Sequence, residues 1–152
     1  MEYIREAAGD ETERCIFCEI PSSSEGAERI LARGDLTYVV LNKFPYNPGH
    51  LLIVPYRHTA DVEDLTPEES AELQLLLRRS VHALRKEAEP HGFNIGMNLG
   101  RTAGAGIPDH VHWHVVPRWG GDTNFTTTVG ETRVLPELLA ETHRRLAPRF
   151  ES

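Results

Sequence analysis

The stretch His110-Val111-His112-Trp113-His114-Val115-Val116-Pro117 places a histidine at every second position over its first five residues. Successive side chains of a β-strand point to opposite faces of the sheet, so the pattern predicts a strand with three imidazole rings on one face and apolar side chains on the other. Imidazoles titrate near neutral pH, bind metals and act as nucleophiles or proton carriers. The stretch therefore predicts a sheet face suited to phosphate or carbonyl transfer, rather than a solvated polar strand.

Short apolar runs predict four further strands, at residues 30–33, 36–41, 50–55 and 93–99. The Gly34-Asp35 pair separates the first two runs and indicates a hairpin turn. Residues 42–49 contain two prolines and a terminal glycine, which is typical of an irregular, shaped loop. Residues 100–109 are rich in glycine and lead directly into the histidine stretch, so their backbone amides are expected beside the imidazoles, where a phosphate could bind.

Two helices are also predicted. Thr66-Pro67-Glu68-Glu69 provides an N-cap, a proline at the first helical position and a glutamate at the third. Leucine and valine then recur at intervals of three and four residues, which extends one buried face to about Glu89. A final helix is expected from the leucine pattern of residues 135–146, with Pro136 near its start.

Composition narrows the class of protein. A length of 152 residues with 39% hydrophobic and 26% charged residues suits one globular domain, which we place at residues 15–152 behind a charged arm at residues 1–14. The formal net charge of -7 argues against a nucleic-acid partner, because such binding depends on many basic residues. No apolar run approaches the roughly 20 residues of a membrane span. We expect a cytoplasmic protein with neither a membrane nor a nucleic-acid partner.

The two cysteines, Cys15 and Cys18, have the spacing of half a zinc site. Two ligands cannot hold a structural tetrahedral zinc, so two more donors are required, and His58 and His110 are the candidates. An unligated thiol pair and a redox pair are the alternative interpretations.

Among the histidines, His112 is best placed to attack a substrate, because a histidine on each side can hold its tautomer or transfer a proton. His50 follows Pro48-Gly49 at the start of a predicted strand, where a structural hydrogen-bonding role is an equal alternative to a chemical one.

The run from His110 to Val116 resembles the motif that names the histidine triad (HIT) superfamily, in which three histidines alternate with apolar residues. The resemblance extends over most of the chain, from Cys15-Ile16-Phe17-Cys18 to Pro117-Arg118-Trp119-Gly120-Gly121-Asp122-Thr123-Asn124-Phe125. The last stretch, together with Tyr46-Asn47-Pro48-Gly49-His50, is most similar to bacterial diadenosine tetraphosphate phosphorylases and hydrolases.

The resemblance implies an α+β fold with an antiparallel sheet of about five strands, one long helix and a C-terminal helix, assembled as a homodimer around the long helix and the adjacent strand. It also implies a nucleotidyl transfer or hydrolysis at the α-phosphate of a dinucleoside polyphosphate, through a nucleotidyl-histidine on His112. His114 matches a phosphate-contacting position and His50 a relay position behind the triad. Residues that match nucleotide-contacting positions are Asn42, Asn98, Gly104, Ala105, Gly106 and Ile107.

The resemblance further implies one structural Zn²⁺ per chain, held by Cys15, Cys18, His58 and His110. Many relatives carry a glutamine or serine shortly before the first triad histidine, whereas this chain has Ile107 and Pro108. Either the backbone amides of residues 104–107 or the triad histidines then serve the leaving group. The alternative functions are a purine nucleoside phosphoramidase and a zinc-stabilised nucleotide-binding module without turnover.

Overall fold

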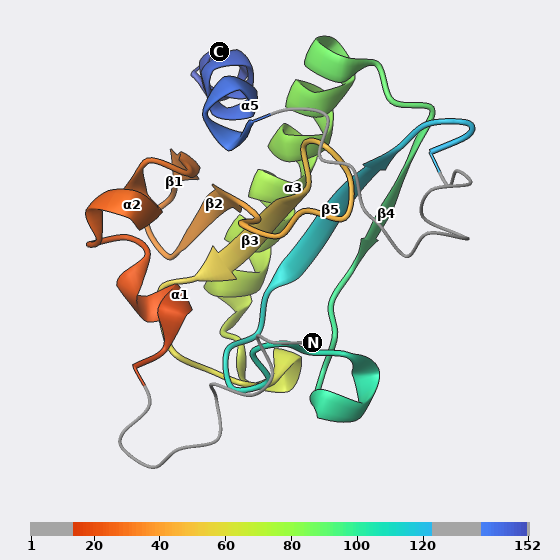
Figure 1. Cartoon of the computed structure of the whole chain (residues 1–152). Helices are drawn as coiled ribbons and strands as arrows, with labels where there is room; N and C mark the ends of the chain where they lie inside the picture. The colour runs from red at the N-terminus through yellow and green to blue at the C-terminus, as the bar shows by residue number, and fades with distance from the viewer. Residues whose placement is uncertain (1–13, 123–137, 152) are drawn as a thin grey trace.

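A five-stranded antiparallel sheet forms the centre of the molecule, whose computed structural model describes residues 14–122 and 138–151 (Figure 1). The strands lie in the order β1-β2-β3-β5-β4. They are β1 (Ile30–Arg33), β2 (Thr37–Leu41), β3 (Leu51–Pro55), β4 (Gly92–Gly96) and β5 (Trp113–Arg118). The predicted α+β class and the strand number are confirmed.

One long helix covers a face of this sheet, and short helices lie around its edges (Figure 1). The helices are α1 (Ile16–Glu19), α2 (Ser24–Ala27), α3 (Pro67–Ala88) and α5 (Leu139–Leu146), with 3-10 turns η2 (Val62–Asp64), η3 (Arg101–Ala103) and η4 (Ala147–Phe150). Helix α3 begins with the predicted capping box, since Glu69 N–H donates to Thr66 Oγ1 and Thr66 N–H donates to Glu69 Oε2. Within the described ranges, no helix has both the length and the apolar character needed to cross a membrane.

The end of the chain follows the prediction in part. Helix α5 starts at Leu139, with Leu138 as its N-cap residue, so the final helix begins later than the leucine pattern indicated. Pro136 and residues 1–13 of the predicted arm at residues 1–14 lie outside the described residues.

Side chains of alternate residues in β2 and β3 supply two separate hydrophobic clusters, one on each face of the sheet. Val39, Leu41, Leu51 and Ile53 pack with α3. Val40 and Leu52 pack on the opposite face with Phe17 of α1. Every residue of these two central strands is buried, because both faces of the sheet are covered here. This accounts for the continuous apolar sequence of the strands.

Strand β5 begins later than the sequence indicated. The histidine stretch predicted a strand from His110, but the ladder with β3 ends at the pair Ile53–Trp113. Beyond that pair the backbone has other partners, because Val111 N–H donates to the Thr59 carbonyl at 2.7 Å and the ring of His110 occupies the Pro55 carbonyl at 2.9 Å. Residues 110–112 therefore precede the strand.

The turn between β1 and β2 is fastened to α3 by one carboxylate. Glu72 accepts hydrogen bonds from the backbone N–H groups of Asp35 and Leu36, both at 2.9 Å, and from Thr37 Oγ1 at 2.6 Å. Burial raises the pKa of Glu72, but these hydrogen bonds outweigh it and hold the pKa below the ordinary value.

We predict that Glu72→Gln lowers the free energy of unfolding by about 1–2 kcal/mol at pH 7, because a charge-assisted set of hydrogen bonds is lost. A folded-state pKa below the unfolded one stabilises the protein above the unfolded pKa, and this contribution disappears as pH falls through the folded pKa. Urea unfolding at pH 7 and pH 3 measures both effects. Glu63→Gln, at an exposed carboxylate, is the control, and an equal loss in both variants would contradict the assignment.

Candidate active site and metal site

The loop of residues 42–49 delivers His50 to the start of β3. Asn47 Nδ2 donates to the Pro117 carbonyl at 3.0 Å, which ties the loop to β5. Gly49 has a φ of 78°, in the left-handed region that glycine adopts without strain. His50 is completely buried at the end of this turn, so its ring is held among fixed partners.

His50 and His114 are joined by a hydrogen bond whose direction follows from the surroundings. The backbone N–H of Tyr46 donates to His50 Nδ1 at 3.0 Å, so this nitrogen holds a lone pair. In neutral His50 the proton is then on Nε2, which lies 2.9 Å from His114 Nδ1 and donates to it. The proton of neutral His114 is consequently on its Nε2.

His112 has the opposite arrangement. Its Nδ1 lies 2.8 Å from the backbone carbonyl of His110, and a carbonyl only accepts, so Nδ1 carries the proton. The Nε2 atom of neutral His112 therefore has a free lone pair. Burial lowers the pKa of His112 despite the hydrogen bond to His110, which keeps the ring neutral and the lone pair present near pH 7.

The rings of the site form a continuous set of contacts. The rings of His112 and His114 are 4.9 Å apart, and those of His50 and His114 are 5.1 Å apart. Phe17 lies 4.6 Å from His112 and 5.5 Å from His110, while Tyr46 lies parallel to His114 at 5.9 Å. The structure thus brings together the four histidines predicted to be catalytic.

Sequence reasoning did not select Phe17 or Tyr46. The only sequence signal for Phe17 is its place between two cysteines, and the signal for Tyr46 is its place in a proline-bounded loop before His50. Both act through ring contacts that depend on the fold.

Cys15, Cys18, His58 and His110 form a cluster that could hold a metal ion, with all four candidate ligand atoms within 4.8 Å of one another. Cys15 Sγ lies 3.2 Å and Cys18 Sγ 3.6 Å from His110 Nδ1, and Cys18 Sγ lies 3.5 Å from His58 Nδ1. Bond lengths of about 2.3 Å for Zn–S and about 2.0 Å for Zn–N put tetrahedral ligands roughly 3.3–3.8 Å apart, so the donor set fits a tetrahedral ion.

The protonation of the cluster also suits a cation. The Pro55 carbonyl lies 2.9 Å from His110 Nε2 and fixes the proton there, which leaves the lone pair of Nδ1 facing the sulfurs. Burial, and then the neighbouring Cys15, raise the pKa of the Cys18 thiol to about 11. A cation between the two sulfurs would offset this cost of ionising them.

A comparison with known families matches residues 23–121 to the HIT domain. The chain belongs to the HIT family. AP-4-A phosphorylase of Mycobacterium tuberculosis is 51% identical over 131 residues, which cover 86% of this chain and 67% of that protein. Bis(5'-nucleosyl)-tetraphosphatase [asymmetrical] of Schizosaccharomyces pombe is 33% identical over 106 residues, covering 70% of this chain and 56% of that protein.

Among solved structures, a Zn-bound histidine triad family protein from Mycobacterium smegmatis superposes with a TM-score of 0.73 at 29% identity, covering 90% of this chain and 93% of that one. The match to the HIT domain lies inside the predicted domain at residues 15–152, whose two bounds stay a prediction.

The residues expected to contact nucleotide lie in two places in this HIT fold. Asn42 follows β2 and has its side chain directed at His50, with Nδ2 3.3 Å from His50 Nδ1. Asn98 donates weakly to the Gly104 carbonyl at 3.4 Å, within the loop that enters the histidine stretch. The other predicted contacts are in the same loop, at Gly104, Ala105, Gly106 and Ile107.

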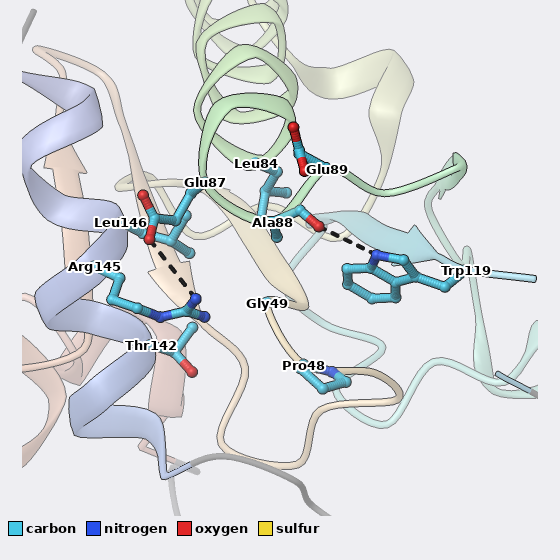
Figure 2. A pocket seen from close by; sticks show the side chains of 10 residues that line it. All are labelled: Pro48, Gly49, Leu84, Glu87, Ala88, Glu89, Trp119, Thr142, Arg145 and Leu146. Atoms are coloured by element: carbon cyan, nitrogen blue, oxygen red, sulfur yellow. Dashed lines mark hydrogen bonds and ion pairs between the residues drawn. The ribbon is translucent and has the colours of Figure 1, made fainter.

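A cavity of about 410 Å³ lies apart from the triad, at the C-terminal end of α3 (Figure 2). Trp119 Nε1 donates to the Ala88 carbonyl at 3.2 Å, and Glu87 pairs with Arg145 of α5 at 3.7 Å. The Trp119 indole therefore satisfies a backbone carbonyl at the C-terminal end of α3. None of the triad histidines lines this cavity.

We predict that His114 titrates far below a free histidine. Burial, and then the neighbouring His112, lower its pKa from 6.5 to about 4. Because the unfolded chain binds the proton more tightly, the His114 contribution makes stability rise with pH across this interval and level off above it. An NMR titration of the His114 ring, assigned with His114→Gln, measures the midpoint, and a value at or above 6.5 would show that the ring is not desolvated.

Proposed function

We propose that this chain is an enzyme that transfers or hydrolyses nucleotidyl groups at the α-phosphate of dinucleoside polyphosphates, with His112 as the nucleophile. The observation that carries the proposal is the hydrogen bond from His112 Nδ1 to the His110 carbonyl, which leaves Nε2 able to attack. The names of the two relatives support the substrate class, since both describe activity on bis-nucleoside tetraphosphates.

In the first step, His112 Nε2 forms a bond to the α-phosphorus, and the bond from phosphorus to the bridging oxygen breaks with its electron pair on the leaving polyphosphate. The imidazole becomes positively charged as this bond forms. Its Nδ1–H···O=C contact with His110 then becomes charge-assisted, and so stabilises the transition state more than the ground state.

The hydrogen-bond direction also gives His114 a role at the phosphate. Its Nε2–H is the remaining donor once Nδ1 accepts from His50, so it can bind a phosphate oxygen. A polyphosphate leaving group needs little protonation, because the second ionisation of a phosphate has a pKa of about 6. A hydrogen bond from His114, or from the backbone amides of residues 104–107, is therefore sufficient to serve it.

The second step returns His112 to its starting form. Water or orthophosphate attacks the phosphorus, the P–N bond breaks, and the electron pair returns to Nε2. Water gives a nucleoside monophosphate, while orthophosphate gives a nucleoside diphosphate. The M. tuberculosis relative is named a phosphorylase, which favours orthophosphate as the acceptor.

We further propose that the metal is Zn²⁺ in a closed structural site. Two thiols and two imidazoles are ligands that zinc prefers, and with four protein ligands no position remains for a reacting water. Bound there, the ion would hold His110 neutral and fixed, and through its carbonyl it would hold the ring of His112. The Zn-bound relative from M. smegmatis supports this choice of metal.

The remaining parts of the proposal concern assembly and location. Strand β4 is at the edge of the sheet, and Ile95 on β4 and Leu75 on α3 are exposed, which supports a homodimer formed around these two elements. Paired cysteines used as metal ligands suit the reducing cytoplasm. The net charge of -7 supports a small-molecule substrate rather than nucleic acid.

The proposal predicts that His112→Ala loses at least about 10³-fold in turnover of diadenosine tetraphosphate while it still binds the nucleotide, because the covalent route is removed. Product analysis by chromatography, with and without orthophosphate, makes the test. ADP formed only with orthophosphate identifies a phosphorylase, and AMP formed in both conditions identifies a hydrolase.

His82→Ala, at an exposed histidine of α3, is the matched control and should turn over normally. Preferred release of AMP from an adenosine phosphoramidate would instead favour a phosphoramidase. Nucleotide binding without any product would favour a binding module, and residual turnover in His112→Ala above one-tenth would exclude His112 as nucleophile.

For the metal, we predict about one zinc per chain, and Cys15→Ser should lower both the zinc content and the midpoint of thermal unfolding, by at least about 5 °C, because closed zinc sites stabilise the fold. Elemental analysis and thermal unfolding measure the two quantities. Glu19→Gln, at the exposed last residue of the short helix α1 that Cys15 precedes, is the control. Fully folded protein that contains no zinc after purification without chelator would contradict a structural zinc site.

A further inference from the structure

Asn42 is held in the structure at both ends of its side chain. Its Oδ1 accepts from the backbone N–H of Phe44 at 3.0 Å, and its Nδ2 lies 3.3 Å from His50 Nδ1. Its own backbone N–H donates to the His50 carbonyl at 3.0 Å. Two of these three contacts are made to His50, so His50 is the main hydrogen-bonding partner of Asn42.

The orientation of the Asn42 amide follows from its neighbours. An N–H donor faces one end of the amide, so that end is the oxygen, and the nitrogen end must face His50. His50 Nδ1 then meets two donors, Asn42 Nδ2 and the Tyr46 backbone N–H. A proton on Nδ1 would set three donors against one another around a completely buried ring, which excludes the Nδ1–H tautomer.

We propose that Asn42 is a positioning residue that, together with the Tyr46 backbone N–H, fixes the tautomer of His50, and through it the direction of the hydrogen bond to His114. With His50 held as the Nε2–H form, its proton points to His114 Nδ1, and the donor of His114 is left on Nε2. In the reversed arrangement His50 would accept from His114 Nδ1, and His114 Nε2 would lose its hydrogen. Asn42 thus adds a second donor to the Tyr46 N–H in keeping the third triad histidine able to donate to a phosphate.

This role differs from the nucleotide contact that family resemblance implies for Asn42. A residue that contacts the ribose acts mainly on substrate affinity, whereas a residue that sets a proton position acts mainly on the chemical step. The two roles therefore separate in the kinetic constants. The kinetic part of the inference rests on the proposed function, while the tautomer of His50 is a property of the protein without substrate.

Two variants test the proposal. Asn42→Ala removes the side-chain amide, and Asn42→Asp is nearly isosteric, can still accept from Phe44 N–H and lacks the donor toward His50. We expect kcat for diadenosine tetraphosphate to fall about tenfold or more in both variants, while KM changes less than about threefold. A rise of KM above tenfold with unchanged kcat would overturn the proposal and identify Asn42 as a substrate contact.

Long-range ¹H–¹⁵N NMR correlation of the substrate-free protein reports the tautomers directly. With signals assigned from His50→Gln and His114→Gln, the unsubstituted protein should show protonated Nε2 and unprotonated Nδ1 in both rings. The His50 nitrogens should shift toward a tautomer mixture in the Asn42 variants. A protonated Nδ1 on His50 in the unsubstituted protein, or unchanged shifts in both variants, would overturn the proposal whether or not dinucleotides are substrates.

Asn94→Ala is the matched control, because Asn94 is exposed on β4 and its side chain contacts Arg118 rather than any histidine of the site. It should keep kcat, KM and the histidine shifts of the unsubstituted protein. Thermal unfolding of every variant verifies that it is folded before its kinetics are compared, and Asn42→Asp provides the test if Asn42→Ala does not fold.

Discussion

His110 is bonded through three of its atoms to three parts of the molecule, and the arrangement of the candidate site depends on it. Its Nδ1 faces the two cysteine sulfurs, its Nε2 donates to the carbonyl of Pro55 at the end of β3, and its own carbonyl accepts from His112. A single residue therefore connects the candidate metal cluster, the sheet and the proposed nucleophile. Any displacement of its backbone carbonyl changes the direction of the His112 ring.

Backbone groups and the Asn42 amide together determine the direction of the hydrogen bonds around the histidines. The Tyr46 N–H can only donate and the His110 carbonyl can only accept, so the tautomers of His50 and His112 follow without reference to any substrate. Burial then keeps the rings of His112 and His114 neutral, as the lowered pKa of each indicates. The protein thereby holds one imidazole with a free lone pair beside one with a free donor, which is the pairing that attack on a phosphate requires.

Those parts of the structure that depend on local chemistry could be predicted from the sequence. The Thr66 capping box and the Gly34-Asp35 turn are short-range signals, and both elements form where they were expected. Alternation placed His112 and His114 together, and half a zinc motif led to four ligand candidates that do converge. Local patterns could not predict hydrogen bonds between residues far apart in the sequence. Examples are the bonds to the Thr59 and Pro55 carbonyls, because of which β5 starts only at Trp113. The inward direction of the Asn42 amide depends on the same kind of contact.

Successive residues of a strand face opposite sides of the sheet. The candidate site is therefore sensitive to insertion or deletion of a single residue at the start of β5. Val115 packs toward α3, while His114 is paired with Leu52, whose side chain lies on the opposite face. Deletion of one residue between His112 and Val115 would move the remaining pattern by one position and exchange the two faces. An imidazole would then enter the apolar layer beneath α3, and an aliphatic side chain would replace it at the candidate site. Substitutions in this strand are thus far more tolerable than insertions or deletions, a constraint that any natural or engineered variant of the strand must satisfy.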